Sequence, residues 1–260
     1  MQFSEQRAGE LPDFPVPRMQ LVLGSVFAGV LALIALILAG SSVITGQAAS
    51  AVATAFFAVF IVATAAFAWS NQPSRNVGEA ARPAVTASTV RYDSRSLALL
   101  AVVVGSLVVV LIGFGSAAGG AMLAICGVMG AFLATFFVPL ITRSIRNGTI
   151  ELTAEGIRRR GWSYEAEVTW DAVVDVSFAS GRYAAIAIRV DPASSLVRRD
   201  TTLFWRIEKL TTEPLIELDC RRVDVHPMVL ARWIRFYSDN PAARVELGTG
   251  AAEDRLVAER

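Results

Sequence analysis

Four long apolar segments fill most of the first 141 residues, and none of them contains an ionisable side chain. They run Leu21–Gly40, Ala49–Trp69, Leu97–Phe114 and Ala117–Ile141. A hydrocarbon core about 30 Å thick is crossed by roughly 20 helical residues, and each segment is near or above that length. The sequence therefore predicts a four-helix transmembrane bundle over residues 21–146, preceded by a polar tail of residues 1–20.

Small residues recur within these segments at helical spacing. The first segment has Ala28, Ala32, Ala35 and Ala39, and the fourth has Gly120, Ala124, Gly127, Ala131 and Ala134. Small side chains let helix backbones approach closely, which matters because lipid tails provide no hydrophobic drive for association. We expect these faces to pack the four helices on one another. The alternative is a surface for a partner membrane protein or a second copy of the chain.

The polar side chains within the segments include the hydroxyls of Thr54, Thr64, Ser106 and Thr135. Each can donate a hydrogen bond to the backbone of its own helix. Transporters and proton relays usually carry ionisable groups at membrane depth, so a conducting or proton-coupled pathway is disfavoured. A pore lined by backbone or hydroxyl groups stays open as an alternative.

One motif in the apolar region has the form of a dinucleotide-binding loop. Gly113-Phe-Gly115-Ser-Ala-Ala118 matches GxGxxA, but that loop requires a strand before it and a helix after it. Here the motif lies between two apolar segments. We interpret it as a tight helical hairpin with its turn at Gly115–Ser116.

The hydrophobic period changes from helical to alternating after Asn147-Gly148. Seven short strands are predicted: Thr149–Thr153, Ile157–Trp162, Glu165–Trp170, Val173–Ala179, Tyr183–Val190, Thr201–Leu210 and Leu215–Cys220. An amphipathic helix follows, with Leu230, Trp233, Ile234 and Tyr237 on one stripe and Arg232 and Arg235 facing away. The fold class is thus membrane α plus soluble β, with a barrel or sandwich over residues 147–247 and a disordered tail over 248–260.

Two segments of this β region resemble bacterial pleckstrin-homology-like (PH-like) domains. Leu152-Thr-Ala-Glu-Gly-Ile157 is similar to their LTxxGI opening hairpin, and Trp170-Asp-Ala-Val-Val-Asp-Val176 to their WxxIxxV segment. The resemblance covers roughly residues 143–240 and implies seven strands closed by one C-terminal helix, as in uncharacterised actinobacterial membrane proteins. Phosphoinositide-binding members of the wider superfamily use a basic loop between their first two strands. The corresponding loop here is Ala154-Glu155-Gly156, short and acidic, which argues against that ligand.

Arginines between the apolar segments predict the orientation. The loop Ser41–Ala48 has no charge, whereas the loop Ser70–Ser96 has Arg75, Arg82, Arg91 and Arg95. More arginines follow the fourth segment. We therefore expect a multi-pass protein of the cytoplasmic (inner) membrane with both termini and the β domain in the cytoplasm.

Candidate chemistry is sparse outside the membrane. The chain has one histidine, two cysteines and no CxxC pair, so no zinc or redox motif can be built. Cys126 and Cys220 lie in different predicted domains, which makes a disulfide between them implausible. His226 precedes Pro227 at a helix start, and the pairs Glu165/Glu167 and Asp171/Asp175 are interpreted as solvated strand carboxylates. We expect no catalytic residue, no metal, no cofactor and no enzymatic activity.

The candidate contact residues are four arginines: Arg143, Arg146, Arg158 and Arg160. The first two directly follow the fourth apolar segment, and the last two share one face of a predicted strand, opposite Ile157. They could contact anionic headgroups or a partner, or simply form a solvated face.

The sequence favours an integral membrane protein whose PH-like domain binds a protein partner or organises a complex. The partner surface would be the domain itself or the small-residue helix faces, a homo-oligomer included, and we expect no nucleic acid. The alternatives are a small transport or channel component regulated by the soluble domain, and a sensor of anionic lipid.

Overall fold

The computed structural model describes residues 18–71, 85–86, 88–179, 185–194, 196–208, 213–223 and 225–258. The chain divides into two compact units. The helical unit comprises residues 17–71 and 94–143, and the β unit comprises residues 72–93 and 144–260. Residues 1–17 of the N-terminal tail lie outside the described residues, as do Arg75 and Arg82 of the loop Ser70–Ser96.

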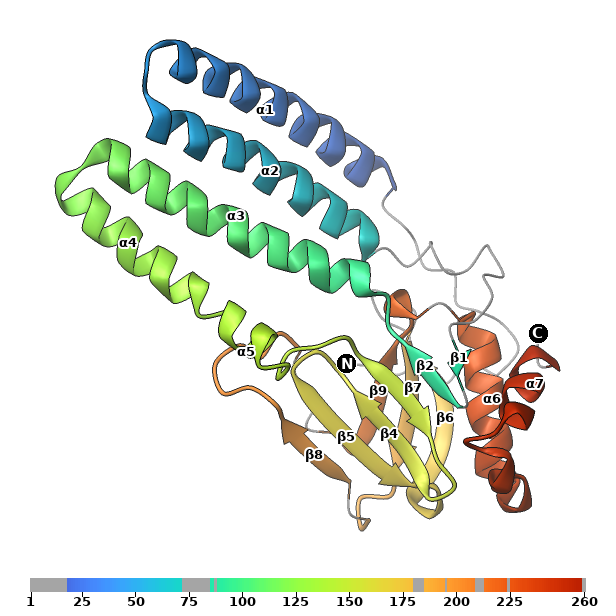
Figure 1. Cartoon of the computed structure of the whole chain (residues 1–260). Coiled ribbons are helices and arrows are strands. Elements are labelled where there is room, and N and C mark those ends of the chain that lie inside the picture. The colour runs from blue at the N-terminus through green and yellow to red at the C-terminus, as the bar shows by residue number, and fades with distance from the viewer. Residues whose placement is uncertain are drawn as a thin grey trace. The chain divides into compact units, whose positions relative to one another are not determined.

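Four helical segments of the helical unit are long and apolar enough to cross a membrane, as expected for a multi-pass membrane protein. They consist of α1 (Arg18–Ile44), α2 (Ala48–Ser70), α3 (Ser94–Ala118) and the pair α4 (Gly120–Ala134) and α5 (Phe137–Ile141), shown in Figure 1. The hydroxyls of Thr54, Thr64, Ser106 and Thr135 each donate to a carbonyl of the preceding turn. The expectation for these four side chains is confirmed.

The helices pack mainly in chain order, α1 on α2, α2 on α3 and α3 on α4 (Figure 1). In the described residues they form a layer in which each helix packs on its neighbours in the chain. The alanine stripe of α1 makes its contact with α2, since Ala32 and Ala35 form a buried cluster with Ala58. The larger side chains, such as Phe27 and Ile37, are exposed on the outside of the layer, where lipid would cover them.

Two glycines of the GxGxxA motif lie inside α3, which continues to Ala118. A Cβ added at Gly113 would lie 2.7 Å from the Cβ of Ala53 in α2, and one at Gly115 would lie 2.8 Å from the Cβ of Cys126 in α4. These glycines bring three helices together, so the motif has no phosphate-binding role. The turn predicted at Gly115–Ser116 is formed instead by Gly119, whose φ is +68°.

The helix of the fourth segment is interrupted once and ends at Ile141, the last residue of the apolar pattern. α4 and α5 are separated at Thr135 and Phe136, because Pro139 has no N–H and its ring clashes with the carbonyl four residues before it. The helix ends at Ile141, and Arg143 has a φ of +58°. Gly148 lies against Tyr92, where an added Cβ would overlap the tyrosine ring.

The β unit contains two antiparallel sheets followed by a helix, which confirms the coarse fold class. The larger sheet has the order β1-β2-β3-β4-β5-β8 and the smaller sheet β6-β7-β9. The strands are β1 (Val85–Thr86), β2 (Thr89–Arg91), β3 (Thr149–Leu152), β4 (Gly156–Arg160), β5 (Tyr164–Thr169), β6 (Val173–Ala179), β7 (Ala185–Val190), β8 (Val197–Asp200) and β9 (Leu215–Asp219). The strand predicted over Thr201–Leu210 is wrong, because residues 201–208 form a loop and β8 precedes it.

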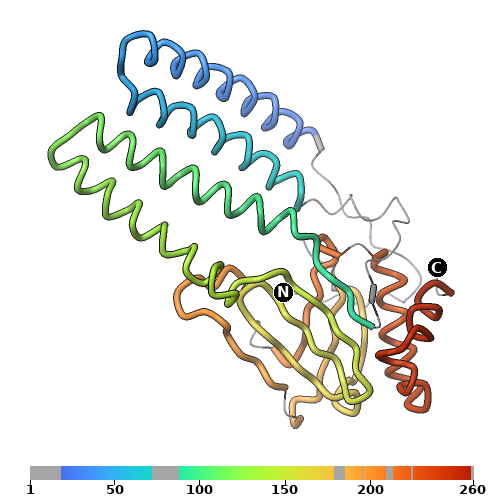
Figure 2. The backbone as a smooth tube through the Cα atoms, in the orientation of Figure 1, coloured from blue at the N-terminus to red at the C-terminus, as the bar shows by residue number. Residues whose placement is uncertain are grey.

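Strand β2 comes from the loop between α2 and α3 and belongs to the β unit, as the trace in Figure 2 shows. It pairs antiparallel with β3, with Val90 opposite Ile150. Both side chains are completely buried. The β domain therefore begins before α3, and the boundary expected at residue 147 omits two of its strands, β1 and β2.

Helix α6 (Pro227–Asp239) closes the β unit as predicted, with Leu230, Trp233, Ile234 and Tyr237 completely buried. Arg235 does not face away, since it donates to the carbonyl of Val176 in β6.

The tail expected to be disordered from residue 248 forms α7 (Gly250–Ala258). Trp233 Nε1 donates to the carbonyl of Ala252 over 3.1 Å, and Leu256 of α7 is completely buried. Arg255 binds Glu246 of the preceding η4 (Pro241–Glu246) through two hydrogen bonds of 2.7 and 2.6 Å. The buried side chains of Ala252 and Leu256, the hydrogen bond from Trp233 and the ion pair between Arg255 and Glu246 hold α7 in the folded β unit.

Candidate functional site

The outer face of the larger sheet brings three of the four candidate arginines together. Arg158 Nη2 lies 3.1 Å from Glu167 Oε2, and Arg160 forms an ion pair with Glu165. Arg146 Nη2 lies 3.8 Å from Oε1 of the same Glu165. The strand alternation predicted from the sequence explains why Arg158 and Arg160 share this face. The carboxylates opposite them were interpreted as merely solvated, but each has an arginine partner.

The strand register continues these pairs into two rows across the sheet. One row is Arg91, Thr149, Arg160, Glu165 and Arg199, and the other is Thr89, Glu151, Arg158, Glu167 and Val197. Opposite charges alternate at neighbouring positions, and such cross-strand pairs stabilise a sheet. We call these two rows the charged face. It presents both signs of charge, and no large basic patch results from it.

Arg143 is not part of the charged face. It belongs to the helical unit and follows the end of α5. Its positive φ is unusual for a side chain other than glycine and marks the end of the helix.

Arg159 lies between the candidate residues Arg158 and Arg160 in β4, and the sequence analysis did not identify it. Its side chain points into the β unit and is buried, on the same strand face as Ile157. Its Nε donates to the hydroxyl of Tyr92 over 3.1 Å, and its guanidinium lies 5.0 Å from the ring centre of Tyr164. Burial raises the pKa of Tyr92, so this hydroxyl remains a neutral acceptor. The strand alternation that places Ile157 in the core also predicts an inward side chain at Arg159, two residues further along.

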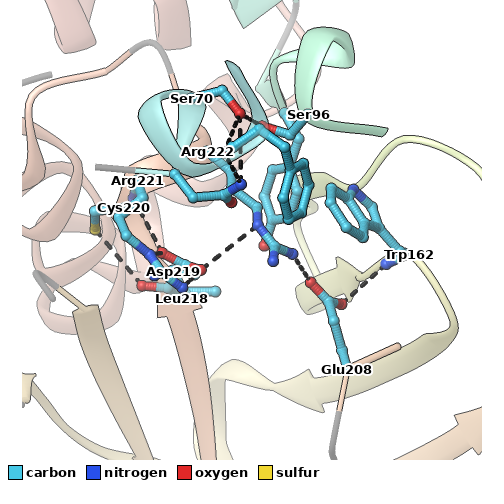
Figure 3. Close-up of polar contacts among 12 residues, drawn as sticks. Ser70, Ser96, Trp162, Glu208, Leu218, Asp219, Cys220, Arg221 and Arg222 are labelled. Atoms are coloured by element: carbon cyan, nitrogen blue, oxygen red, sulfur yellow. Dashed lines mark hydrogen bonds and ion pairs between the residues drawn. The ribbon is translucent and has the colours of Figure 1, made fainter. Parts of the chain in front are cut away.

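A second arginine of the β unit, Arg222, has a side chain 11% exposed and lies at the end of η3 (Cys220–Arg222) (Figure 3). Its guanidinium carbon lies 4.0 Å from the ring centre of Trp162, and its Nη1 forms an ion pair with Glu208. The other carboxylate oxygen of Glu208 accepts from the backbone N–H of Trp162 over 2.9 Å. This cluster connects three segments far apart in the sequence, and its charges are compensated inside the domain.

Asp219 completes the charges around Arg222. Its oxygens accept from Nε and Nη2 of Arg221 over 2.9 and 2.7 Å, and one lies 3.6 Å from Arg222 Nε. Burial acts to raise the pKa of Asp219, but the hydrogen bonds and charge of Arg221 outweigh it and hold the pKa below its ordinary value. A carboxylate held ionised between two arginines is a structural anion and a poor general base.

Cys220, beside this cluster, does not supply a nucleophile. Burial raises the pKa of its thiol far above the ordinary value, and the thiolate is the reactive form. Cys126 and Cys220 are both buried thiols that form no disulfide.

The Arg222 cluster also fixes the chain that leads into α3. The carbonyl of Arg222 accepts from the N–H of Asp93 over 2.7 Å, and Tyr92 forms a β-bridge with Val223. Asp93 is followed directly by Ser94, the first residue of α3. The candidate site thus anchors the end of the loop between α2 and α3 within the β unit.

His226 occupies the N-cap of α6, where its Nδ1 accepts from the N–H of Met228 over 3.3 Å. The interpretation of a helix-end residue is confirmed. Desolvation, followed by the charge of Arg232, lowers the pKa of His226. Among the described residues, no group of three histidine, cysteine or carboxylate side chains could hold a metal ion.

Comparisons with known proteins found no match to this chain among family models, curated proteins or solved structures.

Proposed function

We propose that this chain is a multi-pass protein of the cytoplasmic membrane whose PH-like β domain binds a protein partner in the cytoplasm and organises a complex. The charged face is the observation that carries the proposal. Opposite charges alternate over three neighbouring positions in each of its two rows, as Glu151, Arg158 and Glu167 in one and as Arg160, Glu165 and Arg199 in the other. A partner with the complementary order of charges would be recognised there, because charge complementarity fixes register and excludes other partners.

The same face gives little support to a sensor of anionic lipid. Attraction to an anionic leaflet needs a cluster of one sign, at about 1 kcal/mol per basic residue near the surface. Arg158 and Arg160 are each paired with a glutamate of the next strand. Paired charges offer a bilayer much less than the sequence count of arginines suggests.

The pairing of β2 with β3 supports the proposed orientation. Residues 89–91 and 149–152 lie in one sheet, so the loop after the second span and the chain after the fourth are in the same compartment. The arginines of both segments are therefore counted together, and the positive-inside rule favours the cytoplasm for them.

A non-catalytic role is supported by the way the β domain uses its buried polar groups. Asp219 and Glu208 are both engaged by arginines, and Cys220 is held as a neutral thiol. A PH-like fold is supported by the two antiparallel sheets and the closing helix α6. Such a fold presents surfaces but does not by itself imply a reaction.

Purification from gently solubilised membranes tests the proposal. The native chain should retain a protein in a fixed ratio, and exchanging Arg158→Glu with Glu167→Arg should release it. This exchange keeps an ion pair between β4 and β5 but reverses the order of charges. The matched control exchanges Arg255→Glu with Glu246→Arg, a pair outside the charged face. Retention by the first double variant, or no stoichiometric protein with the native chain, would contradict the proposal.

A further inference from the structure

The loop after β8 displays two large apolar side chains to the surroundings. Leu203 is 74% exposed and Phe204 is 81% exposed. The other exposed large apolar side chains among the described residues of the β unit are valines: Val174, Val197, Val245 and Val257. We call Leu203 and Phe204 the apolar tip. Leu203 and Phe204 are adjacent in the chain and both highly exposed, and contiguous exposed apolar side chains are typical of protein or membrane interaction sites.

The apolar tip is held by a closed turn. The hydroxyl of Thr202, itself buried, donates to the carbonyl of Trp205 over 2.9 Å across the base of the tip. Arg206 Nη2 lies 3.2 Å from Asp200 Oδ2, so an ion pair joins the residues on either side of the segment 201–205. The hydrogen bonding of this base is satisfied by the loop itself, and the two side chains at its end are left without contacts that would cover them.

Covalent connection and one hydrogen bond keep this loop close to the membrane. Thr201 Oγ1 donates to the carbonyl of Ser144 over 2.8 Å. Ser144 follows Ile141, the last residue of the fourth candidate span, by three residues, which is at most about 11 Å of chain. Leu203 and Phe204 follow Thr201 by two and three residues, so the apolar tip stays within reach of the headgroup region.

The composition of the loop fits a membrane interface. Trp205 follows the apolar tip, and aromatic side chains concentrate where the headgroups meet the hydrocarbon. Arg206 follows Trp205 in its ion pair with Asp200, and a long side chain of this kind can stay at the level of the headgroups while the apolar side chains enter. We propose that the apolar tip inserts into the bilayer interface and attaches the β domain to the membrane that holds the spans. This attachment needs no protein partner and no particular headgroup.

Site-directed spin labelling of the full chain in lipid nanodiscs tests the insertion. A nitroxide at Phe204→Cys should collide readily with oxygen but several-fold less with a water-soluble nickel chelate than one at Val245→Cys. Val245 is the matched control because it is 79% exposed and apolar. The native protein, labelled in the same way, gives the background from the buried Cys126 and Cys220. Leu203→Cys should behave like Phe204→Cys.

Each other outcome would overturn the proposal in a recognisable way. Equal nickel collision at Phe204 and Val245 would place the apolar tip in water. Low collision with both oxygen and nickel would mean that a protein surface, such as a second copy, covers it. Because apolar insertion is insensitive to charge, the nickel protection should persist in neutral lipid and at 1 M salt, where the Debye length is about 3 Å. Loss of protection under either condition would indicate an electrostatic contact instead.

Discussion

Arg159 Nε donates a hydrogen bond of 3.1 Å to the hydroxyl of Tyr92, and the two residues are 67 positions apart in the chain. Arg159 belongs to β4, whereas Tyr92 directly follows β2 in the loop between two membrane helices. This buried contact fastens the loop to the domain that follows the last span. Its loss would leave a buried guanidinium donor without its acceptor.

Tyr92→Phe should therefore destabilise the β domain, by about 1–3 kcal/mol for a buried donor left unsatisfied. Thermal unfolding of the full chain in nanodiscs measures the change. The combination of Tyr92→Phe with Arg159→Met completes a double-mutant cycle. We expect the double variant to lose less stability than the sum of the losses of the two single variants. Additive losses would mean that the hydrogen bond contributes nothing.

Gly113→Ala should disturb the contact between α2 and α3, because its Cβ would meet Ala53 at 2.7 Å. Overpacking of this kind typically costs about 1–3 kcal/mol. Gly29→Ala is the matched control, since nothing lies within 4 Å of a Cβ there. The thermal stability of the solubilised protein should fall for Gly113→Ala alone. Equal stability of both variants would mean that the helices do not approach at Gly113.

Leu256→Ala tests the docking of α7. Leu256 is completely buried and the adjacent Val257 is 49% exposed. Removing a buried leucine side chain costs about 2–5 kcal/mol, so Leu256→Ala should lower the melting temperature of the β domain clearly. Val257→Ala should change it little. If the two variants melt alike, α7 is not part of the folded domain.

The stability of the β domain should decrease as the pH falls below about 6.5, the ordinary pKa of histidine. The pKa of His226 in the folded chain is lowered, so the unfolded chain binds a proton first. Neutral His226 contributes its full stabilisation above that range and loses it as the pH falls through its folded pKa. The capping bond is worth about 1 kcal/mol. His226→Asn keeps a cap that does not titrate and should flatten the pH dependence between 7 and 5, measured by denaturant unfolding; an unchanged profile would exclude His226 as its source.

Labelling of single cysteines in intact cells tests the orientation. Thr45→Cys, between α1 and α2, should react with a membrane-impermeant maleimide. Arg91→Cys, in β2, should react only after the membrane is permeabilised. The native chain gives the background because Cys126 and Cys220 are buried. The reverse pattern would place the β domain outside the cell.

The periodic parts of this fold could be predicted from the sequence, and the non-local pairings could not. Apolar length alone identifies four spans, and alternation locates β4 with its outward Arg158 and Arg160. Strand β2 is three residues long, and its partners are the two-residue β1 and the strand β3, which lies beyond α3, α4 and α5. A strand that depends on distant pairing leaves almost no local signal.

The candidate site shows the same division. Arg158 and Arg160 lie on the predicted face because alternation is a local property. Their partners Glu165 and Glu167 depend on the register of β4 against β5, and Glu208 reaches Arg222 from a loop outside both sheets. Arg159 was predictable from alternation, yet an arginine on an apolar strand face is uncommon unless it is paired, and its partner Tyr92 lay in a different predicted domain.

The pairing of β2 with β3 has a consequence for biosynthesis. About 60 residues, including two complete membrane spans, separate the two strands, and a ribosome adds ~5–20 residues per second. β2 thus emerges roughly 3–12 s before its neighbour and waits as an open edge beside the translocation channel. It can be completed only if the third and fourth spans insert as a hairpin that returns the chain to the starting side. A nascent chain that loses one of these spans cannot close its β domain, and the exposed edge would mark it for removal by quality control.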